Sequence, residues 1–116
     1  MPLYPQHFKS YLLVICLFLT VSFCTLALAL QDANVVVAEI LIRKGDSKGA
    51  YQLLEPLESA RAGDTDYDYV FGVAAVESNN AARGLIALER VLAKDKSHKN
   101  ARAAIDKARS ADAREG

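Results

Sequence analysis

Few side chains in this sequence are of the types that build catalytic or metal sites. The two histidines are His7, near the N-terminus, and His98, in a lysine-rich segment, and neither has a partner at a suitable spacing. Because metal sites and catalytic triads recruit several such residues together, we expect His98 to be a solvated loop residue. No glycine-rich phosphate loop follows a strand, because the sequence predicts no strand.

An acidic cluster has the alternate spacing of part of a calcium loop and consists of Asp64, Asp66 and Asp68. A calcium loop also needs a glycine at its sixth position and a closing glutamate. Tyr69 stands at that sixth position, and the glutamate is missing. We therefore expect these carboxylates to complement the positive end of a helix dipole. The sequence predicts no catalytic residue, no metal site and no cofactor.

The overall charge gives no reason to expect a nucleic acid as partner. Lys+Arg and Asp+Glu each number 14, so the formal net charge is zero. The length of 116 residues leaves room for one small domain. The basic stretch from Lys94 to Lys99 is interrupted by Asp95, and we interpret it as a solvated turn.

An apolar N-terminal segment without charge runs from Tyr11 to Leu30. The small-x-small pattern Ala27-Leu28-Ala29 predicts cleavage by signal peptidase before Leu30. We interpret residues 1–29 as a Sec-type signal peptide that exports the chain to the periplasm. The alternative is an uncleaved inner-membrane anchor facing the periplasm, because about 20 uncharged residues cover a hydrocarbon core of roughly 30 Å.

Both cysteines, Cys16 and Cys24, lie inside this apolar segment, so a cleaved product would have no thiol and no disulfide. Cys24 is a poor candidate for lipoprotein acylation, because the bulky Phe23 precedes it where a small residue is needed.

The rest of the chain predicts an all-α fold, because apolar residues recur at three- and four-residue spacing and no alternating strand pattern is present. Five helices are expected. Their apolar stripes are, in chain order, Val36, Val37, Ile40 and Leu41; Ala50, Leu53, Leu54 and Leu57; Tyr67, Val70, Phe71, Ala74 and Ala75; Leu85, Leu88, Val91 and Leu92; and Ala101, Ala104, Ile105 and Ala108. The last stripe is thin, which suits a terminal capping helix.

Helix boundaries are predicted from glycine, proline and capping residues. Gly45 ends the first helix, Asp46 or Ser47 caps the second, and Pro56 should kink it. The remaining boundaries are the break at Ala62-Gly63-Asp64-Thr65, a capping box from Thr65 to Asp68, a turn at Ser78-Asn79-Asn80, and a cap for the fifth helix at Asn100.

Similar residues recur 34 positions apart. Gly45-Asp46 corresponds to Asn79-Asn80, Ala50 to Gly84, Leu54 to Leu88, and Leu57 to Val91. Pairs of helices at this spacing are typical of tetratricopeptide repeats, in which stacking buries a face that one hairpin leaves open.

Residues 34–109 resemble the tetratricopeptide family. The pairs Val37-Ala38 and Phe71-Gly72 occupy the places of its large and small residues in the first helix. Gly45 and Asn79 occupy its turn position. The runs Ala50 to Glu58, Ala62-Gly63-Asp64, Tyr67-Asp68-Tyr69 and Leu88 to Ala93 resemble repeats of envelope-exported proteins of Gram-negative bacteria. The family's closing proline is replaced by Ala62 and Lys96, and Asp106 replaces the small residue of a third unit. We therefore expect two helix-turn-helix repeats and a capping helix in a domain of residues 30–109, followed by a polar tail, 110–116.

The resemblance implies a protein-binding adaptor that is not an enzyme. Its concave face would be lined by the first helix of each pair, and here that face presents Glu39, Ile42, Arg43, Tyr69, Val73, Val76 and Glu77. Tyr67 and Tyr69 point about 200° apart on a helix, so one should be buried and the other available to a partner. The expected partner is a protein or peptide. The chain is expected to contact a membrane only through residues 11–30, if these are not cleaved off. Formation of a homo-oligomer is a further possibility.

Two other functions are kept as alternatives. The first is that the chain is the N-terminal helical segment, or a truncated remnant, of a larger envelope export or assembly protein. A failure to fold stably alone would favour this alternative. A remote alternative is a cell-wall hydrolase with Glu77 and Glu89 as its acidic pair, although nothing in their spacing demands it.

Overall fold

The structure, a computed structural model, describes residues 7–115, with side chains for residues 7–25 and 33–114. Within this range the chain forms six α-helices and one 3-10 turn and no strand, which confirms the all-α prediction. Two compact units are distinguished, Met1–Ala33 and Asn34–Gly116. Helix α1 (His7–Arg43) contributes to both, and each unit is described by itself.

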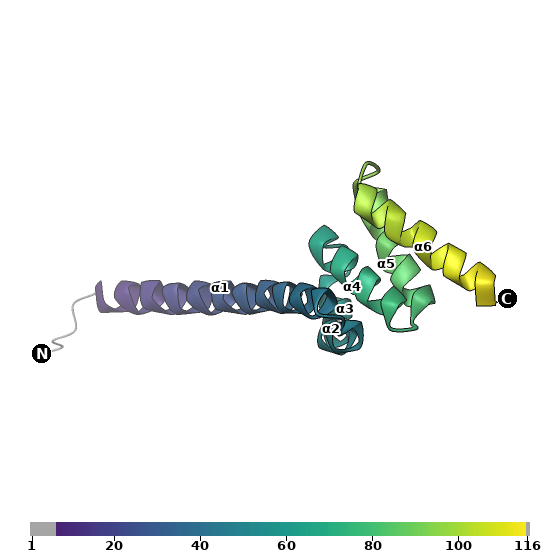
Figure 1. Ribbon diagram of the computed structural model, residues 1–116. Helices are drawn as coiled ribbons and strands as arrows, with labels where there is room; N and C mark the ends of the chain where they lie inside the picture. Colours follow the sequence, from purple (N-terminus) through teal and green to yellow (C-terminus); the bar gives the residue numbers. More distant parts are fainter. Residues whose placement is uncertain (1–6, 116) are drawn as a thin grey trace, which may run out of the picture. The chain divides into compact units, whose positions relative to one another are not determined.

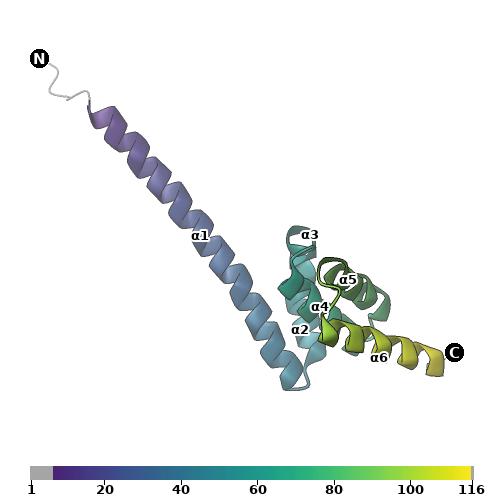
Figure 2. The ribbon, with the colours of Figure 1, turned by 90° about the horizontal axis from the view of Figure 1, so that it is seen from above.

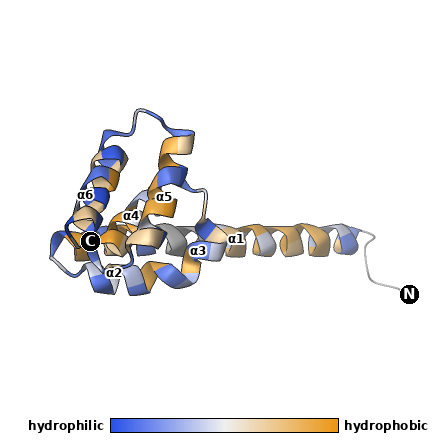
Figure 3. Cartoon of the chain, turned by 90° about the vertical axis from the view of Figure 1, so that its right-hand side faces the viewer, coloured by the Kyte–Doolittle hydropathy of each residue, from blue (hydrophilic) through white to orange (hydrophobic). Residues whose placement is uncertain are grey.

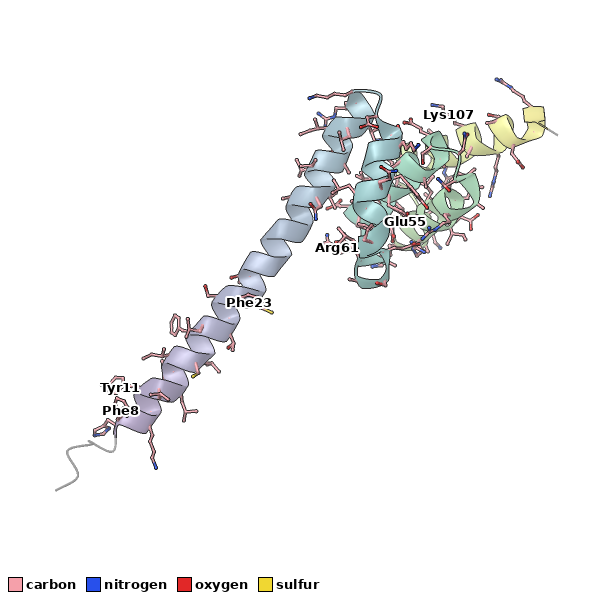
Figure 4. All side chains as sticks on the ribbon, turned by 90° about the horizontal axis from the view of Figure 1, so that it is seen from below. Phe8, Tyr11, Phe23, Glu55, Arg61 and Lys107 are labelled. Atoms are coloured by element: carbon pink, nitrogen blue, oxygen red, sulfur yellow. The ribbon has the colours of Figure 1, made fainter. Side chains whose placement is uncertain are left out.

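The first unit is the apolar part of α1, drawn as one continuous helix in Figure 2 and largely in orange in Figure 3. His7–Thr25 is long and apolar enough to cross a membrane, by length and composition. Phe8, Tyr11 and Phe23 are exposed and project from this helix in Figure 4. Cys16 and Cys24 are free and exposed. The side chains of the predicted cleavage site, Ala27-Leu28-Ala29, lie outside the part that the structure describes.

The second unit starts with residues 34–43 of α1 and continues through five further α-helices and one 3-10 turn. These are α2 (Ser47–Leu54), η1 (Glu55–Leu57), α3 (Glu58–Arg61), α4 (Thr65–Glu77), α5 (Ala81–Lys94) and α6 (Lys99–Glu115). Helix α4 packs along α5 and also against α2, while α6 packs mainly on α5 (Figure 1). Helix α4 is therefore the central element of this unit.

The turns after α1 and after α4 have the same geometry. Gly45 and Asn79 adopt positive φ angles of 87° and 67°, as their positions in the 34-residue period predict. The following residues, Asp46 and Asn80, donate their backbone N–H groups to the carbonyls of Leu41 and Ala75, each at 2.8 Å. Both helices thus end in the left-handed glycine-type cap.

The crossing of α4 and α5 needs small residues. A Cβ atom added to Gly84 would lie 2.7 Å from the Gly72 carbonyl oxygen and 2.6 Å from Val76 Cγ2. Both distances are shorter than real Cβ contacts, so only glycine fits at this position. The close approach of α4 and α5 therefore leaves no room for a side chain at residue 84.

Pro56 interrupts the second predicted helix. Helix α2 ends at Leu54, and Pro56 lies in the 3-10 turn η1 before α3 resumes at Glu58. The cause is the missing proline N–H together with its clash with the preceding turn. The predicted kink is confirmed.

The core of the second unit consists of two clusters. One joins Val35 and Ala38 of α1 to residues of α2, α4 and α5, and the other joins Leu88 and Val91 of α5 to Ala101 and Ile105 of α6. Tyr67 is fully buried, and its hydroxyl donates to the Leu54 carbonyl at 2.7 Å. The stripes predicted for α4, α5 and α6 contribute to this core.

The stripe predicted for the first helix is wrong at three of its four positions, and only Leu41 packs against the core. Val36, Val37 and Ile40 are 54%, 47% and 43% exposed, whereas Val35 and Ala38 are buried. A helix covered on one side buries residues at three- and four-residue spacing, and the register here runs through residues 35, 38 and 42. An apolar run leaves that register ambiguous, because every position in Val35-Val36-Val37-Ala38 is apolar.

Two caps also differ from the predictions. Asp64, and not Thr65, caps α4 by accepting from the Asp66 N–H, while Asp68 accepts from the Gly63 N–H at 2.8 Å. His98, and not Asn100, caps α6, since its Nδ1 accepts from the Ala101 N–H at 3.1 Å. His98 lies in the loop between α5 and α6, as predicted, but it is half-buried and not fully solvated.

Candidate functional site

Five of the seven residues predicted for a binding surface line one cavity of about 180 Å³. Glu39, Ile42 and Arg43 come from the last turns of α1, and Tyr69, Val70 and Val73 come from α4. All of them belong to the second unit. The sequence prediction named every lining residue except Val70, which is nearly buried behind its neighbours.

The cavity combines an apolar interior with a charged rim. Ile42 and Val73 are half-buried and, with Val70, supply branched aliphatic side chains. Arg43 and Glu39 form an ion pair at 3.5 Å, and their side chains are 72% and 46% exposed. An exposed pair of this kind is worth about 0–1 kcal/mol, so both groups can exchange this contact for another.

Tyr69 forms one wall of the cavity. Its ring centroid lies 5.0 Å from that of His98, whose role in capping α6 fixes the imidazole. Burial raises the pKa of the Tyr69 hydroxyl, and the negative charges of Glu39 and Glu77 raise it further. The Tyr69 hydroxyl is therefore held in its neutral form, which can donate a hydrogen bond.

The other two predicted residues lie further along α4. Val76 lines a second cavity of about 290 Å³ together with Asn79, Ala81 and residues of α6, namely Ala108, Ala111 and Asp112. Glu77 accepts a hydrogen bond from the Ser47 hydroxyl, and its carboxylate lies 3.9 Å from Lys107 Nζ. Tyr69, Val73 and Val76 thus form one face of α4, and a cavity opens at each end of it.

Arg83 joins α5 to α2, η1 and α3, and the sequence analysis did not identify it. Its guanidinium donates to the Tyr51 hydroxyl at 2.8 Å, to Glu55 at 2.5 Å and to Glu58. It also lies 5.8 Å from the ring centroids of Tyr51 and Phe71. The hydrogen bonds to Glu55 and Glu58 raise the pKa of the Arg83 guanidinium. Its partners are 25 to 32 residues away in sequence, so no local pattern points to them.

Arg90 and Asp68 form a second cross-helix pair. Arg90 Nη2 lies 2.9 Å from Asp68 Oδ1, and the Asp68 side chain is 1% exposed. The hydrogen bond to Asp68 raises the pKa of Arg90. Asp68, predicted as a capping residue and as a charge near a helix N-terminus, therefore also joins α4 to α5.

Two further carboxylates, Asp64 and Glu89, are paired with arginines. Asp64 pairs with Arg61 at 2.6 Å, and Glu89 pairs with Arg109 at 3.4 Å. Glu77 on α4 contacts Ser47 and Lys107, whereas Glu89 on α5, the other member of the acidic pair of the hydrolase alternative, contacts Arg109. Within residues 7–115 no group of three or more His, Cys, Asp or Glu side chains could hold a metal ion.

The geometry favours binding of a ligand through one apolar cavity with polar groups at its edge, the usual composition of a recognition pocket. No protein-family model, curated protein or solved structure matches this chain.

Proposed function

We propose that this chain is a tetratricopeptide-like adaptor of the bacterial cell envelope that binds a protein or peptide and performs no chemistry. The binding face consists of Glu39, Ile42 and Arg43 on α1 and of Tyr69, Val73, Val76 and Glu77 on α4. The observation that carries the proposal is the cavity lined by five of these residues. Aromatic, arginine and aliphatic groups around a concave site are typical of protein recognition.

The repeat arrangement is supported by two turns with one geometry. Gly45 and Asn79, 34 residues apart, both have left-handed backbones and are followed by the same 2.8 Å backbone bond. In this interpretation residues 34–61 form the first repeat, α4 and α5 form the second, and α6 is the cap. The small pair Gly72 and Gly84 allows the second hairpin to close.

The envelope location rests on the apolar helix His7–Thr25, a property shared by signal peptides and membrane anchors. We favour export to the periplasm with cleavage before Leu30, and an inner-membrane anchor is the alternative. Intact mass and fractionation in a Gram-negative host separate the two. A soluble species starting at Leu30 supports the free adaptor, whereas a full-length membrane species supports the anchor.

Site-specific photo-crosslinking in such a host tests the binding face. A photoreactive amino acid is placed at Ile42 and at Tyr69, and as a control at Ile86, an apolar residue of α5 that is 55% exposed. We expect Ile42 and Tyr69 to crosslink to the same partner and Ile86 to give no such product. Crosslinks from Ile86 alone, or equal products from all three positions, would be incompatible with the proposal.

One observation favours a second candidate, docking within a larger envelope assembly. Val36, Val37 and Ile40 form an exposed apolar strip on the first repeat helix. Single exposed apolar residues are ordinary, but a contiguous strip indicates a covered surface. Crosslinking from Val37 into a large complex, with no product from Tyr69, would favour this candidate over the adaptor.

A further inference from the structure

A further cavity, at the start of α6, is lined mainly by charged side chains. Its volume is about 420 Å³, and it lies where the loop after α5 meets the first turns of α6. The lining residues carry three positive charges and one negative charge, although the formal net charge of the whole chain is zero. They are Lys96, Ser97, Lys99, Arg102, Ala103 and Asp106.

The three cations of this cavity have no carboxylate as a direct partner. Arg83 and Arg90, in the same unit, both form ion pairs with glutamate or aspartate. In the part of the chain that the structure describes, no carboxylate oxygen lies within 4.0 Å of the charged nitrogens of Lys96, Lys99 or Arg102. Their charge is therefore not compensated by a neighbouring group, and the cavity attracts anions.

Hydrogen bonds hold the loop that carries these cations in one shape. Asp95 Oδ1 accepts from the Ser97 N–H at 3.1 Å and from the Ser97 hydroxyl at 2.7 Å. Arg102 Nη2 donates to the Lys96 carbonyl at 2.8 Å, which fixes the guanidinium beside the loop. A guanidinium has five N–H donors, so this bond leaves others free for a ligand. Less conformational entropy is then lost when an anion binds.

We propose that this cavity binds a phosphate monoester group, with Arg102 donating hydrogen bonds to its oxygens and Lys96 and Lys99 supplying further positive charge. A phosphate monoester carries a charge of about −1.5 to −2 at pH 7 and has three acceptor oxygens. This charge matches the excess of two positive charges in the lining, and a guanidinium can bind two phosphate oxygens at once. A carboxylate or a phosphodiester carries only one negative charge. The site is separate from the face of α1 and α4, so the inference does not depend on the proposed function.

The test is a titration of the isotope-labelled full chain in nonionic detergent, followed by nuclear magnetic resonance of its backbone amides. The two probes are methyl phosphate and dimethyl phosphate, compared at constant ionic strength and at a pH of about 7.5, where the monoester is mostly a dianion. We expect methyl phosphate to shift the amide signals of Ser97, Lys99 and Arg102 with saturation. Its Kd should be about five-fold lower than that of dimethyl phosphate, the effect of one further exposed charge pair.

The decisive variant is Arg102→Gln, with Arg114→Gln as its control. Both arginines are exposed on α6, but Arg114 lies outside the cavity. We expect Arg102→Gln to raise the Kd for methyl phosphate about five-fold and Arg114→Gln to leave it nearly unchanged. Lys99→Gln should also raise the Kd, and it leaves the bond from Arg102 to the loop in place. Asp106→Asn removes the one negative charge of the lining and should lower the Kd.

A second arm separates a lipid headgroup from a soluble compound as the source of the phosphate. The full chain is placed in nanodiscs of phosphatidylcholine with or without phosphatidic acid, whose headgroup is a phosphate monoester. Shifts of the same amides by phosphatidic acid, with no further change on adding methyl phosphate, identify the lipid, whereas shifts by methyl phosphate alone identify a soluble compound. Either result supports the inference. It is overturned if neither probe gives a saturating shift, if methyl and dimethyl phosphate bind equally, or if Arg114→Gln weakens binding as much as Arg102→Gln.

Discussion

Replacement of Gly84 by alanine tests the packing on which the second unit depends. An added Cβ would lie 2.6 Å from Val76 Cγ2, 2.7 Å from the Gly72 carbonyl oxygen and 2.9 Å from the Val76 nitrogen. Two of these three atoms belong to the backbone of α4, so no change of rotamer relieves them. The helices must separate by several tenths of an ångström.

The expected cost follows from two opposing effects. Overpacking of this kind costs typically about 1–3 kcal/mol, and contacts with backbone belong at the upper end. Alanine in place of a helical glycine contributes about 0.5–1 kcal/mol in the opposite sense. We therefore expect Gly84→Ala to lower the free energy of unfolding by about 2 kcal/mol.

The assay is urea unfolding of the full chain in detergent, followed by far-ultraviolet circular dichroism. Ala103→Gly, at an exposed position of α6, measures the helix-propensity effect without a packing change and should cost about 0.5–1 kcal/mol. If Gly84→Ala were neutral or stabilising, the close crossing of α4 and α5 would be refuted.

Three further predictions concern the same unit. Leu88→Ala, at a fully buried residue, should cost about 2–5 kcal/mol in urea unfolding, and a change under about 0.5 kcal/mol would contradict its place in the core. Arg90→Met leaves the buried Asp68 carboxylate without its cation and should cost about 2–3 kcal/mol, whereas Arg109→Met, at an exposed pair, should cost less than about 1 kcal/mol. Burial raises the pKa of the Tyr67 hydroxyl in the folded chain above its unfolded value of about 10. Its contribution to the free energy of unfolding is therefore fully present below about pH 10 and is lost as the pH rises above it, by about 1.4 kcal/mol per pH unit. Tyr67→Phe should flatten this alkaline slope of the free energy of unfolding, and an equally steep slope would contradict the assignment.

Helix positions were predictable because each depends on local signals. Gly45 and Asn79 end helices in the left-handed conformation, and Pro56 breaks the helix that contains it, whatever surrounds them. The resemblance to the tetratricopeptide family put Glu39, Ile42 and Arg43 on one face with Tyr69 and Val73, and these residues do line one cavity. For the turns and the helix break, one short stretch of sequence carries the information.

Features that depend on distant partners were not predictable. The register of Val35 to Ile40 is set by which side α2 and α4 cover, and a uniformly apolar run contains no mark of it. His98 caps α6 and lies against Tyr69, 29 positions earlier in the chain, so its spacing to other histidines was uninformative. Arg83 and Arg90 were overlooked because arginines on a helix ordinarily face solvent.

The break at Pro56 bears on how the second unit unfolds. In a regular helix the Glu58 N–H would bond to the Leu54 carbonyl, but here it bonds to that of Glu55. The Leu54 carbonyl accepts a hydrogen bond from the Tyr67 hydroxyl of α4 instead. Separation of α4 from α2 would break this hydrogen bond and expose the Leu54 carbonyl to water. The bond therefore adds to the apolar contacts of the core cluster that couple the unfolding of α2 to that of α4.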